Sequence, residues 1–280
     1  MADWVLRSES ERATRGNGAG LLGLWRWASL PFLLFLLLPL AALALRVTPE
    51  QLLTSFGTAT VQQAVGLSLR TSAAAMGLAV ALGTPVAYLL ARRRFRLKRV
   101  LEALVDLPVV LPPAVAGLAL LMAFGRNGLL GGLLEALGLS IAFSPAAVVL
   151  AQTFVAAPFY IRAATIGFSH VETELEQAAS IDGASAWQVF RHVTAPLAWP
   201  GLVSGAALAW ARALGEFGAT IIFAGNFPGR TQTMPLAIYL GFQLDLDTAL
   251  TLSVLLVGLS AAALVLVRIL LQAEPPIERS

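Results

Sequence analysis

The sequence has no cysteine, two histidines and a single lysine, and each scarcity excludes a kind of chemistry. Without cysteine the chain can form neither a disulfide nor a thiolate metal site. His170 and His192 are too few for a metal centre, so we expect surface imidazoles. A phosphate-binding loop of the GxxxxGK type needs a lysine after glycine, whereas Lys98 follows Leu97. We therefore predict no catalytic residue, no metal and no bound nucleotide on this chain.

Charge is also scarce: charged residues make up 12% of the chain, hydrophobic residues 58%, and the mean hydropathy is +0.78. Soluble domains carry about 25% charged residues. The composition thus predicts membrane spans rather than a soluble core. The net charge of +3 does not indicate nucleic acid, because the basic residues gather where membrane topology places them. They form a block at residues 92–99 and a group at Arg7, Arg12, Arg15 and Arg26.

Apolar runs of the length needed to cross a bilayer, roughly 20 residues, predict an all-α membrane protein with about six transmembrane helices. The expected spans are residues 28–47, 67–91, 104–124, 145–166, 197–223 and 248–271. The first run is longer than a signal peptide and lacks a cleavage site, so we expect a retained helix. The domain 28–271 would lie between cytoplasmic tails at 1–27 and 272–280.

The segments between the spans carry further signals. Pro108, Pro112 and Pro113 are expected to break or kink the third span. Residues 48–63, 126–144 and 224–247 are expected outside the membrane, the second of them with a short interfacial helix. The block at residues 92–99 marks the cytoplasmic side.

A polar segment, residues 168–196, interrupts the apolar pattern between the fourth and fifth spans. Asp182 and Gly183 predict a turn after a first helix, since glycine takes the positive φ that closes helices. Ser185 is suited to cap a second short helix. In that helix Trp187, Phe190 and Val193 form an apolar stripe, and Pro196 starts the next span. The pattern predicts a helix–turn–helix on the membrane face, for which an ordinary amphipathic connector is the alternative.

This segment resembles the EAA loop of ABC importer permeases. The resemblance rests on Gln177, Ala178, Ala179, Gly183 and Pro196 at the family's spacing. The chain departs from the pattern with Gln177 in place of Glu, Val193 in place of Ile and Ala195 in place of Leu, although Glu176 supplies a neighbouring carboxylate. The resemblance implies an ATPase-coupling loop: Glu176, Gln177, Ala178, Ala179, Asp182, Gly183 and Pro196.

Two other stretches, residues 106–131 and 211–239, are similar to the molybdate and tungstate branch of these permeases. Sulfate and thiosulfate permeases share parts of both stretches and stay as an alternative substrate class. A stand-alone carrier would show inverted repeats and midplane ion sites, which we do not find. A protein that merely docks partners through residues 168–196 is the third alternative.

The resemblance implies the type I ABC importer fold and a set of partners. A second copy of the chain would complete the pathway, two ATPase subunits would bind residues 168–196 and hold ATP and Mg²⁺, and a soluble periplasmic or extracellular protein would deliver the oxyanion. The chain would lie in a bacterial or archaeal cytoplasmic membrane with both termini inside.

Arg212 and Glu216 stand four residues apart in the fifth predicted span. Charges at mid-bilayer cost on the order of 2.5–3.5 kcal/mol on insertion scales, so such residues are expected to pair and to face a pathway or the bundle. Either Arg212 meets a passing oxyanion while Glu216 orients it, or the pair fixes helix packing. The pathway candidates are Arg212, Gly215, Glu216, Gly218 and Thr220. External donors, or solvated loop residues, are Asn226, Arg230, Thr231 and Thr233.

Overall fold

The computed structural model describes residue 25 and residues 27–272, and the chain divides into two compact units, Met1–Pro49 and Glu50–Ser280. The first unit contains the helix Trp27–Arg46, which is apolar along its 20 residues. This helix coincides with the first predicted span. The predicted tails at 1–27 and 272–280 lie almost wholly outside the described residues.

The second unit is helical throughout the part of the chain that is described. Its elements follow in the order α2 (Pro49–Phe56), α3 (Ala59–Arg92), α4 (Lys98–Val110), α5 (Pro113–Phe124), α6 (Gly131–Ala136), α7 (Pro145–Ser169), α8 (Thr173–Ile181), α9 (Ala186–Val189), η1 (Phe190–Thr194), α10 (Ala195–Leu214), α11 (Gly218–Phe223), α12 (Met234–Leu244) and α13 (Leu246–Gln272).

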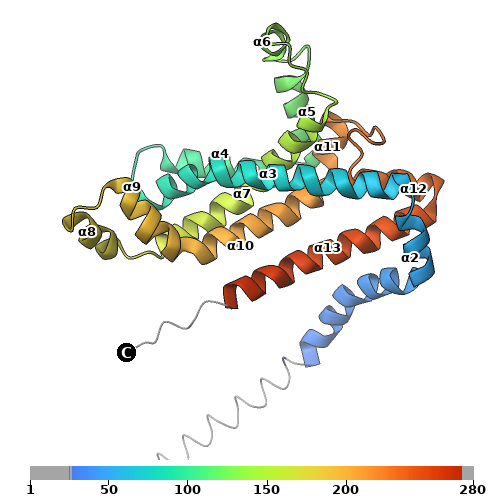
Figure 1. Cartoon of the computed structure of the whole chain (residues 1–280), viewed down its shortest axis with the longest axis horizontal. Helices are drawn as coiled ribbons and strands as arrows, with labels where there is room; N and C mark the ends of the chain where they lie inside the picture. The colour runs from blue at the N-terminus through green and yellow to red at the C-terminus, as the bar shows by residue number, and fades with distance from the viewer. Residues whose placement is uncertain (1–24, 26, 273–280) are drawn as a thin grey trace, which may run out of the picture. The chain divides into compact units, whose positions relative to one another are not determined.

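Three long helices, α3, α7 and α10, lie side by side and form the centre of this unit (Figure 1). Their shared core is built mainly from alanine, with Tyr160 and Phe168 as the large fully buried side chains. A Cβ added at Gly201 would lie 2.6 Å from the Cα of Gly167, so α10 touches α7 backbone to backbone. Small residues permit this close packing, which favours helix association in a bilayer.

The third predicted span is two helices rather than one. α4 and α5 are bent by 114° at the break between them, where Leu111 and Pro112 leave helical geometry. Proline lacks an N–H and clashes with the preceding turn, and this is the reason the sequence predicted a break here. α4 also begins at Lys98, six residues before the predicted start of the span at 104.

The number of spans differs from the expected six. Within the described ranges, four helices are long and apolar enough to cross a membrane, and the bent pair α4 and α5 would make a fifth. The predicted fifth span, 197–223, corresponds to α10 and α11 separated by a break after Leu214. Proline, tryptophan and Arg212 interrupt its apolar run, so neither helix is among the candidates.

Two segments expected to be connecting loops contain helices. Residues 48–63 form α2 and the first turn of α3, so α3 starts eight residues before the predicted span at 67. Residues 224–247 contain α12, whose Met234 and Leu236 are fully buried. Both segments are predicted as external connections between spans, although residues 234–244 are themselves apolar.

Asp245 connects α12, which ends at Leu244, to α13, which begins at Leu246. Asp245 caps α13: its carboxylate accepts a hydrogen bond from the Thr248 hydroxyl at 2.5 Å and one from the Thr248 N–H at 3.3 Å. Both hydrogen bonds favour the ionised carboxylate and so lower the pKa of Asp245 below its usual range. The bond from the Thr248 hydroxyl has the larger effect. The capping hydrogen bonds thereby fix the first turn of α13 and the direction in which this helix leaves α12.

Candidate functional site

The segment from α8 to η1 has the helix–turn–helix form that its sequence predicts. Gly183 closes α8 with a φ of +90°, where a side chain would be strained. Ser185 caps α9 in a capping box with Gln188: its hydroxyl accepts from the Gln188 N–H at 3.4 Å, and its own N–H donates to the Gln188 side chain at 2.8 Å. The turn between the helices is therefore locally encoded.

The second half of the segment joins α10 without a break. After α9 the chain widens into one π-helical turn, η1, and the N–H of Ala195 donates to the carbonyl of Phe190. Pro196 follows in the first turn of α10, and because the helix is continuous here its missing N–H removes one hydrogen bond from the ladder beside the π-helical turn. A displacement of α9 would consequently be transmitted directly to α10.

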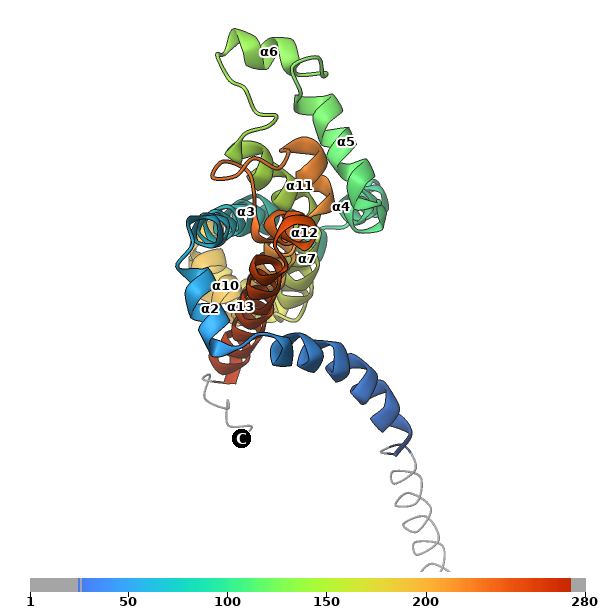
Figure 2. The same ribbon diagram turned by 90° about the vertical axis from the view of Figure 1, so that its right-hand side faces the viewer.

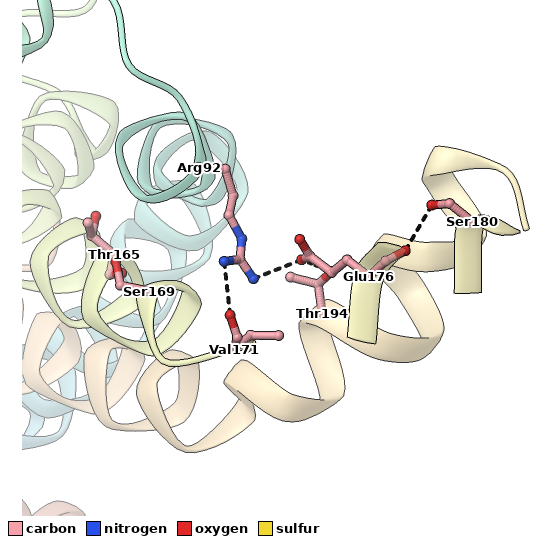
Figure 3. Close-up of polar contacts among 7 residues, drawn as sticks. All are labelled: Arg92, Thr165, Ser169, Val171, Glu176, Ser180 and Thr194. Carbon is pink, nitrogen blue, oxygen red and sulfur yellow. Dashed lines mark hydrogen bonds and ion pairs between the residues drawn. The ribbon is translucent and has the colours of Figure 1, made fainter. Parts of the chain in front are cut away.

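A partly buried polar cluster anchors α8 to the membrane helices (Figure 3). The carboxylate Oε1 of Glu176 accepts from Arg92 Nη2 at 2.8 Å and from Thr194 Oγ1 at 2.6 Å. Arg92 Nη1 also donates to the carbonyl of Val171 at 2.9 Å. The side chains of Arg92 and Glu176 are 11% and 16% exposed, so solvent screens this ion pair little. One carboxylate thus connects α3, α8 and η1.

Aromatic rings pack beside this polar cluster. Tyr88 of α3 meets Phe168 and Phe190 edge to face, with ring centroids 5.5 and 5.4 Å apart. Trp187 stacks on Phe190 at 5.6 Å. Such pairs contribute about 0.5–1.5 kcal/mol each beyond burial of their area. The predicted apolar stripe of α9 and η1 therefore does pack, through Phe190, against α3 and α7.

The outer side of the segment is exposed, and α8 and α9 lie beyond the ends of α3, α7 and α10 (Figure 1). The most exposed large apolar side chains of α8 and α9 are Ile181, at 85%, and Trp187, at 66% exposure. The other predicted coupling residues surround them: Gln177, Ala178, Asp182, Gly183 and Pro196 are exposed and Ala179 is half-buried. Large apolar side chains at the tip of a polar element are typical of a surface that another protein covers.

The structure separates this site into an anchor and a tip, and the sequence did not predict the anchor. Arg92 was assigned to the basic topology block, and Thr194 and Ile181 carried no signal of their own. Glu176 was predicted as a residue of the coupling loop, without the two donors that it binds. Contacts between residues as far apart in the chain as Arg92 and Glu176 depend on how α3 and α8 pack, which periodicity alone does not encode.

Arg212 and Glu216 form the ion pair that their spacing predicts, with 2.7 Å between Arg212 Nη2 and Glu216 Oε2. Glu216 is 1% exposed and also accepts from the Ala219 N–H at 2.8 Å. α10 ends at Leu214, so the pair bridges the break before α11 rather than lying on one helix face. The Arg212 side chain, 30% exposed, lines a cavity of about 110 Å³ at the bend between α4 and α5.

The other pathway candidates surround this break. Gly218 packs on Pro113, because an added Cβ would lie 2.5 Å from the Cβ of that proline. Thr220 is fully buried, and its hydroxyl has no hydrogen-bond partner among the described residues. Gly215 is exposed. The structure therefore brings Arg212, Glu216 and Gly218 together at the junction of α10, α11 and α5.

The four candidate donors before α12 are split by burial. Thr231 and Thr233 are fully buried, and the Thr231 hydroxyl accepts from the Phe227 N–H at 3.1 Å. Asn226 is half-buried and donates to the carbonyl of Leu236 at 3.4 Å. Arg230 alone is exposed. The interpretation of this segment as a solvated loop is therefore wrong for the two threonines.

Comparison with known proteins gives close relatives along most of the chain. The molybdenum transport system permease protein ModB of Mycobacterium tuberculosis is 49% identical over 239 residues, which cover 84% of this chain and 90% of that protein. The sulfate transport system permease protein CysW of Synechococcus elongatus is 36% identical over 245 residues, covering 86% of this chain and 85% of the relative. The molybdenum permease is the more similar of these two.

The fold has a solved counterpart in a bacterial alginate ABC transporter, determined in complex with an alginate pentasaccharide-bound periplasmic protein. The two chains superpose with a TM-score of 0.66 at 17% identity, over 89% of this chain and 91% of the other. Residues 83–273 match the family model of binding-protein-dependent transport system inner membrane components. The chain is therefore a multi-pass membrane protein that belongs to this family and has the fold of the type I ABC importer transmembrane subunits.

Proposed function

We propose that this chain is the membrane-spanning subunit of an ATP-driven importer of molybdate, with tungstate as a second substrate. The observation that carries the proposal is the 49% identity to a molybdenum permease across 84% of the chain. Sulfate or thiosulfate import is the second candidate, supported by the 36% identity to a sulfate permease. Membership of a binding-protein-dependent family favours both over a stand-alone carrier.

The segment 168–196 is the contact for the ATPase in this proposal. The exposed Ile181 and Trp187 enter a cleft of the ATPase, while Glu176 and the aromatic rings hold the segment on α3 and α7. ATP and Mg²⁺ bind that partner. Two ATPase subunits then move two coupling segments, one on each copy of a homodimer, and η1 transmits the movement to α10.

The proposed pathway runs between the two copies past the break of α10. Arg212 contributes positive potential there, and Glu216 fixes its orientation through the 2.7 Å ion pair. Alternating access needs two states that ligands bind differently, and the breaks at Gly215 and between α4 and α5 are the places where the backbone can change direction. A soluble binding protein supplies the anion from the side opposite the coupling segment.

Proteoliposomes test the proposal. The chain, its ATPase and its binding protein are reconstituted, and ATP-dependent uptake of molybdate, tungstate and sulfate is measured. We expect molybdate and tungstate to be accumulated and sulfate not. Uptake of sulfate alone would replace the substrate and keep the class, whereas failure of an ATPase to assemble with the chain would overturn the importer.

A bulky substitution tests the coupling segment separately. Gly183→Trp places an indole at an exposed turn with a φ of +90°, where no neighbour lies within 4 Å of an added Cβ. The variant should insert normally and yet lose ATPase binding or coupled uptake, because the indole stands between the segment and its partner. Normal uptake and co-purification in this variant would rule out residues 168–196 as the contact.

A further inference from the structure

A second cavity lies at the other end of α7 from the coupling segment. Its volume is about 610 Å³, and its walls come from the end of α5, from α6, from residues 138–143 and from the turn at 227–230. α7 starts beside it at Pro145 and ends beside α8 at Ser169. At 1.5 Å per residue, a helix of 25 residues separates these ends by about 37 Å. Figure 2 shows α6 beyond α5, above the turn that precedes α12.

Two arginines line this cavity, Arg126 after α5 and Arg230 before α12. In the part of the chain that the structure describes, neither has an acidic side chain within ion-pair distance. Arg92, Arg162 and Arg212, by contrast, each pair with an acid. Glu135 is the acidic residue on the cavity wall, which leaves a formal charge of +1 there.

The wall that carries Arg230 is held by a specific backbone conformation. The N–H groups of Arg230 and Thr231 both donate to the carbonyl of Phe227, and Gly229 has a φ of +72°. This turn is tight because glycine alone takes that conformation without strain. The hydroxyl of the buried Thr231 also accepts a hydrogen bond from the Phe227 N–H. Arg230 therefore projects from a turn of defined shape.

The facing wall stores backbone strain. Phe143 has a φ of +58°, which is costly for an aromatic residue, and its N–H donates to the carbonyl of Phe223 at 3.2 Å. At Gly225 an added Cβ would lie 2.7 Å from the ring of Phe227 and 3.3 Å from that of Phe143. The two walls are thus interlocked. Strained residues of this kind gather at ligand sites, where the surroundings hold them.

We propose that this cavity is a reception site for the tetrahedral oxyanion, on the side of the membrane opposite the coupling segment. The guanidinium groups of Arg126 and Arg230 donate hydrogen bonds to the anion. A planar guanidinium suits this ligand because two of its N–H groups can bind two oxygens of a tetrahedral oxyanion. The Ser140 hydroxyl, on the wall formed by residues 138–143, adds a hydrogen-bond donor. Glu135 keeps the affinity low, so that the anion moves on toward the membrane. The inference rests on the proposed function, since that function supplies an oxyanion.

Direct binding tests the site without the binding protein. The complex of this chain with its ATPase is purified, and equilibrium binding of radiolabelled molybdate is measured. Removal of a charge-assisted hydrogen bond in Arg126→Gln or Arg230→Gln should weaken binding about tenfold. Glu135→Gln should tighten it about fivefold, because a like charge leaves the wall. Arg126→Lys should retain part of the affinity, and binding should fall as salt is raised.

The matched control is Arg94→Gln, an exposed arginine in the basic loop between α3 and α4. It changes the net charge equally and should leave molybdate binding unchanged. Equal affinity in all variants, or no binding by the unaltered complex at millimolar molybdate, would overturn the site. So would variants that shift only the concentration of binding protein needed to stimulate the ATPase, since the arginines would then be a docking surface for that protein.

Uptake into proteoliposomes separates this inference from the function on which it rests. A complex that transports molybdate but binds it equally in every variant keeps the function and overturns the site. Binding of sulfate, rather than molybdate, with the same dependence on Arg126 and Arg230 supports the site and changes the substrate. Binding that depends on both arginines in a complex that transports no oxyanion supports the site and overturns the importer.

Discussion

Glu176 uses a single carboxylate oxygen to hold two donors from different helices, Arg92 of α3 and Thr194 of η1. A carboxylate in this position stabilises the segment only while both donors reach it. Its removal would leave Arg92 partly buried with the Val171 carbonyl but without an acidic partner. Arg92 Nε already lacks a hydrogen-bond partner among the described residues. The contact of α8 with α3 and η1 thus depends largely on one residue that precedes the family motif.

Glu176→Gln should therefore uncouple transport from ATP hydrolysis. Loss of a hydrogen-bonded charge in a half-buried site costs about 1.5–3 kcal/mol, which is enough to loosen α8 from α3. Molybdate uptake per ATP hydrolysed, measured in proteoliposomes, should fall several-fold while ATPase binding persists.

Two further variants decide between a specific pair and a general loss of stability. The double substitution Arg92→Glu with Glu176→Arg should restore part of the coupling, though not all, because Arg92 also donates to Val171. Glu102→Gln removes an exposed partner of Lys98 at 3.9 Å, a pair of little energetic value. Equal uncoupling in this control, or no rescue by the exchange, would contradict the positioning role of Glu176.

At the scale of elements, the contact of α7 with α10 depends on small residues on both helices. Ala163 and Gly167 on α7 face Gly201 and Gly205 on α10, and added Cβ atoms at the two glycines of α10 would lie within 3.1 Å of α7 atoms. In each helix the small residues are four apart, the spacing that aligns one helix face. The two helices join the coupling segment at both of its ends, so their contact carries any movement of that segment.

Gly201→Ala should destabilise the protein by about 1–3 kcal/mol, because the methyl group would meet backbone that cannot move aside. The midpoint of thermal unfolding in detergent measures this. Gly77→Ala is the matched control in α3, where an added Cβ meets no atom within 4 Å. It should be neutral or stabilising, since alanine is the better helix former. A Gly201→Ala variant as stable as the control would mean that α7 and α10 separate more easily than their packing indicates.

At the scale of the whole molecule, positive charge is distributed between the two ends of the helices. The loop between α3 and α4, with its neighbouring residues, carries Arg93, Arg94, Arg96, Lys98 and Arg99 on the side of the coupling segment. The other end, around α6 and the start of α12, carries Arg126 and Arg230. From the positive-inside rule we propose that the coupling segment, residues 168–196, faces the cytoplasm.

The absence of native cysteine makes this orientation directly testable. Ser180→Cys lies in the exposed part of α8, and Asn127→Cys lies in the exposed turn after α5. The variants are expressed without the ATPase, which would cover residue 180. A membrane-impermeant thiol reagent on intact cells should label the second variant and not the first, and permeabilised cells should show labelling of both. Labelling of Ser180→Cys in intact cells would invert the proposed topology and, with it, the side on which the ATPase binds.

Local patterns determined a large part of this protein from sequence alone. Apolar runs predicted helices in a membrane, the prolines predicted the break between α4 and α5, and Gly183 with Ser185 predicted the turn of the coupling segment. These features follow from residues near one another in the chain, whose propensities and spacing act locally. The pairing of Arg212 with Glu216 belongs to the same group.

Other features were decided only by the tertiary structure. The Arg92–Glu176–Thr194 anchor, the burial of Thr231 and Thr233 and the meeting of Arg126 with Glu135 and Arg230 around one cavity all join segments distant in sequence. α12 escaped prediction because a short apolar run is not distinguished by periodicity from a loop near a membrane surface. Helix packing decides which charged side chains form ion pairs and which face a cavity. An ion pair needs its atoms within about 4 Å of each other. The sequence alone does not set that distance between side chains on different helices.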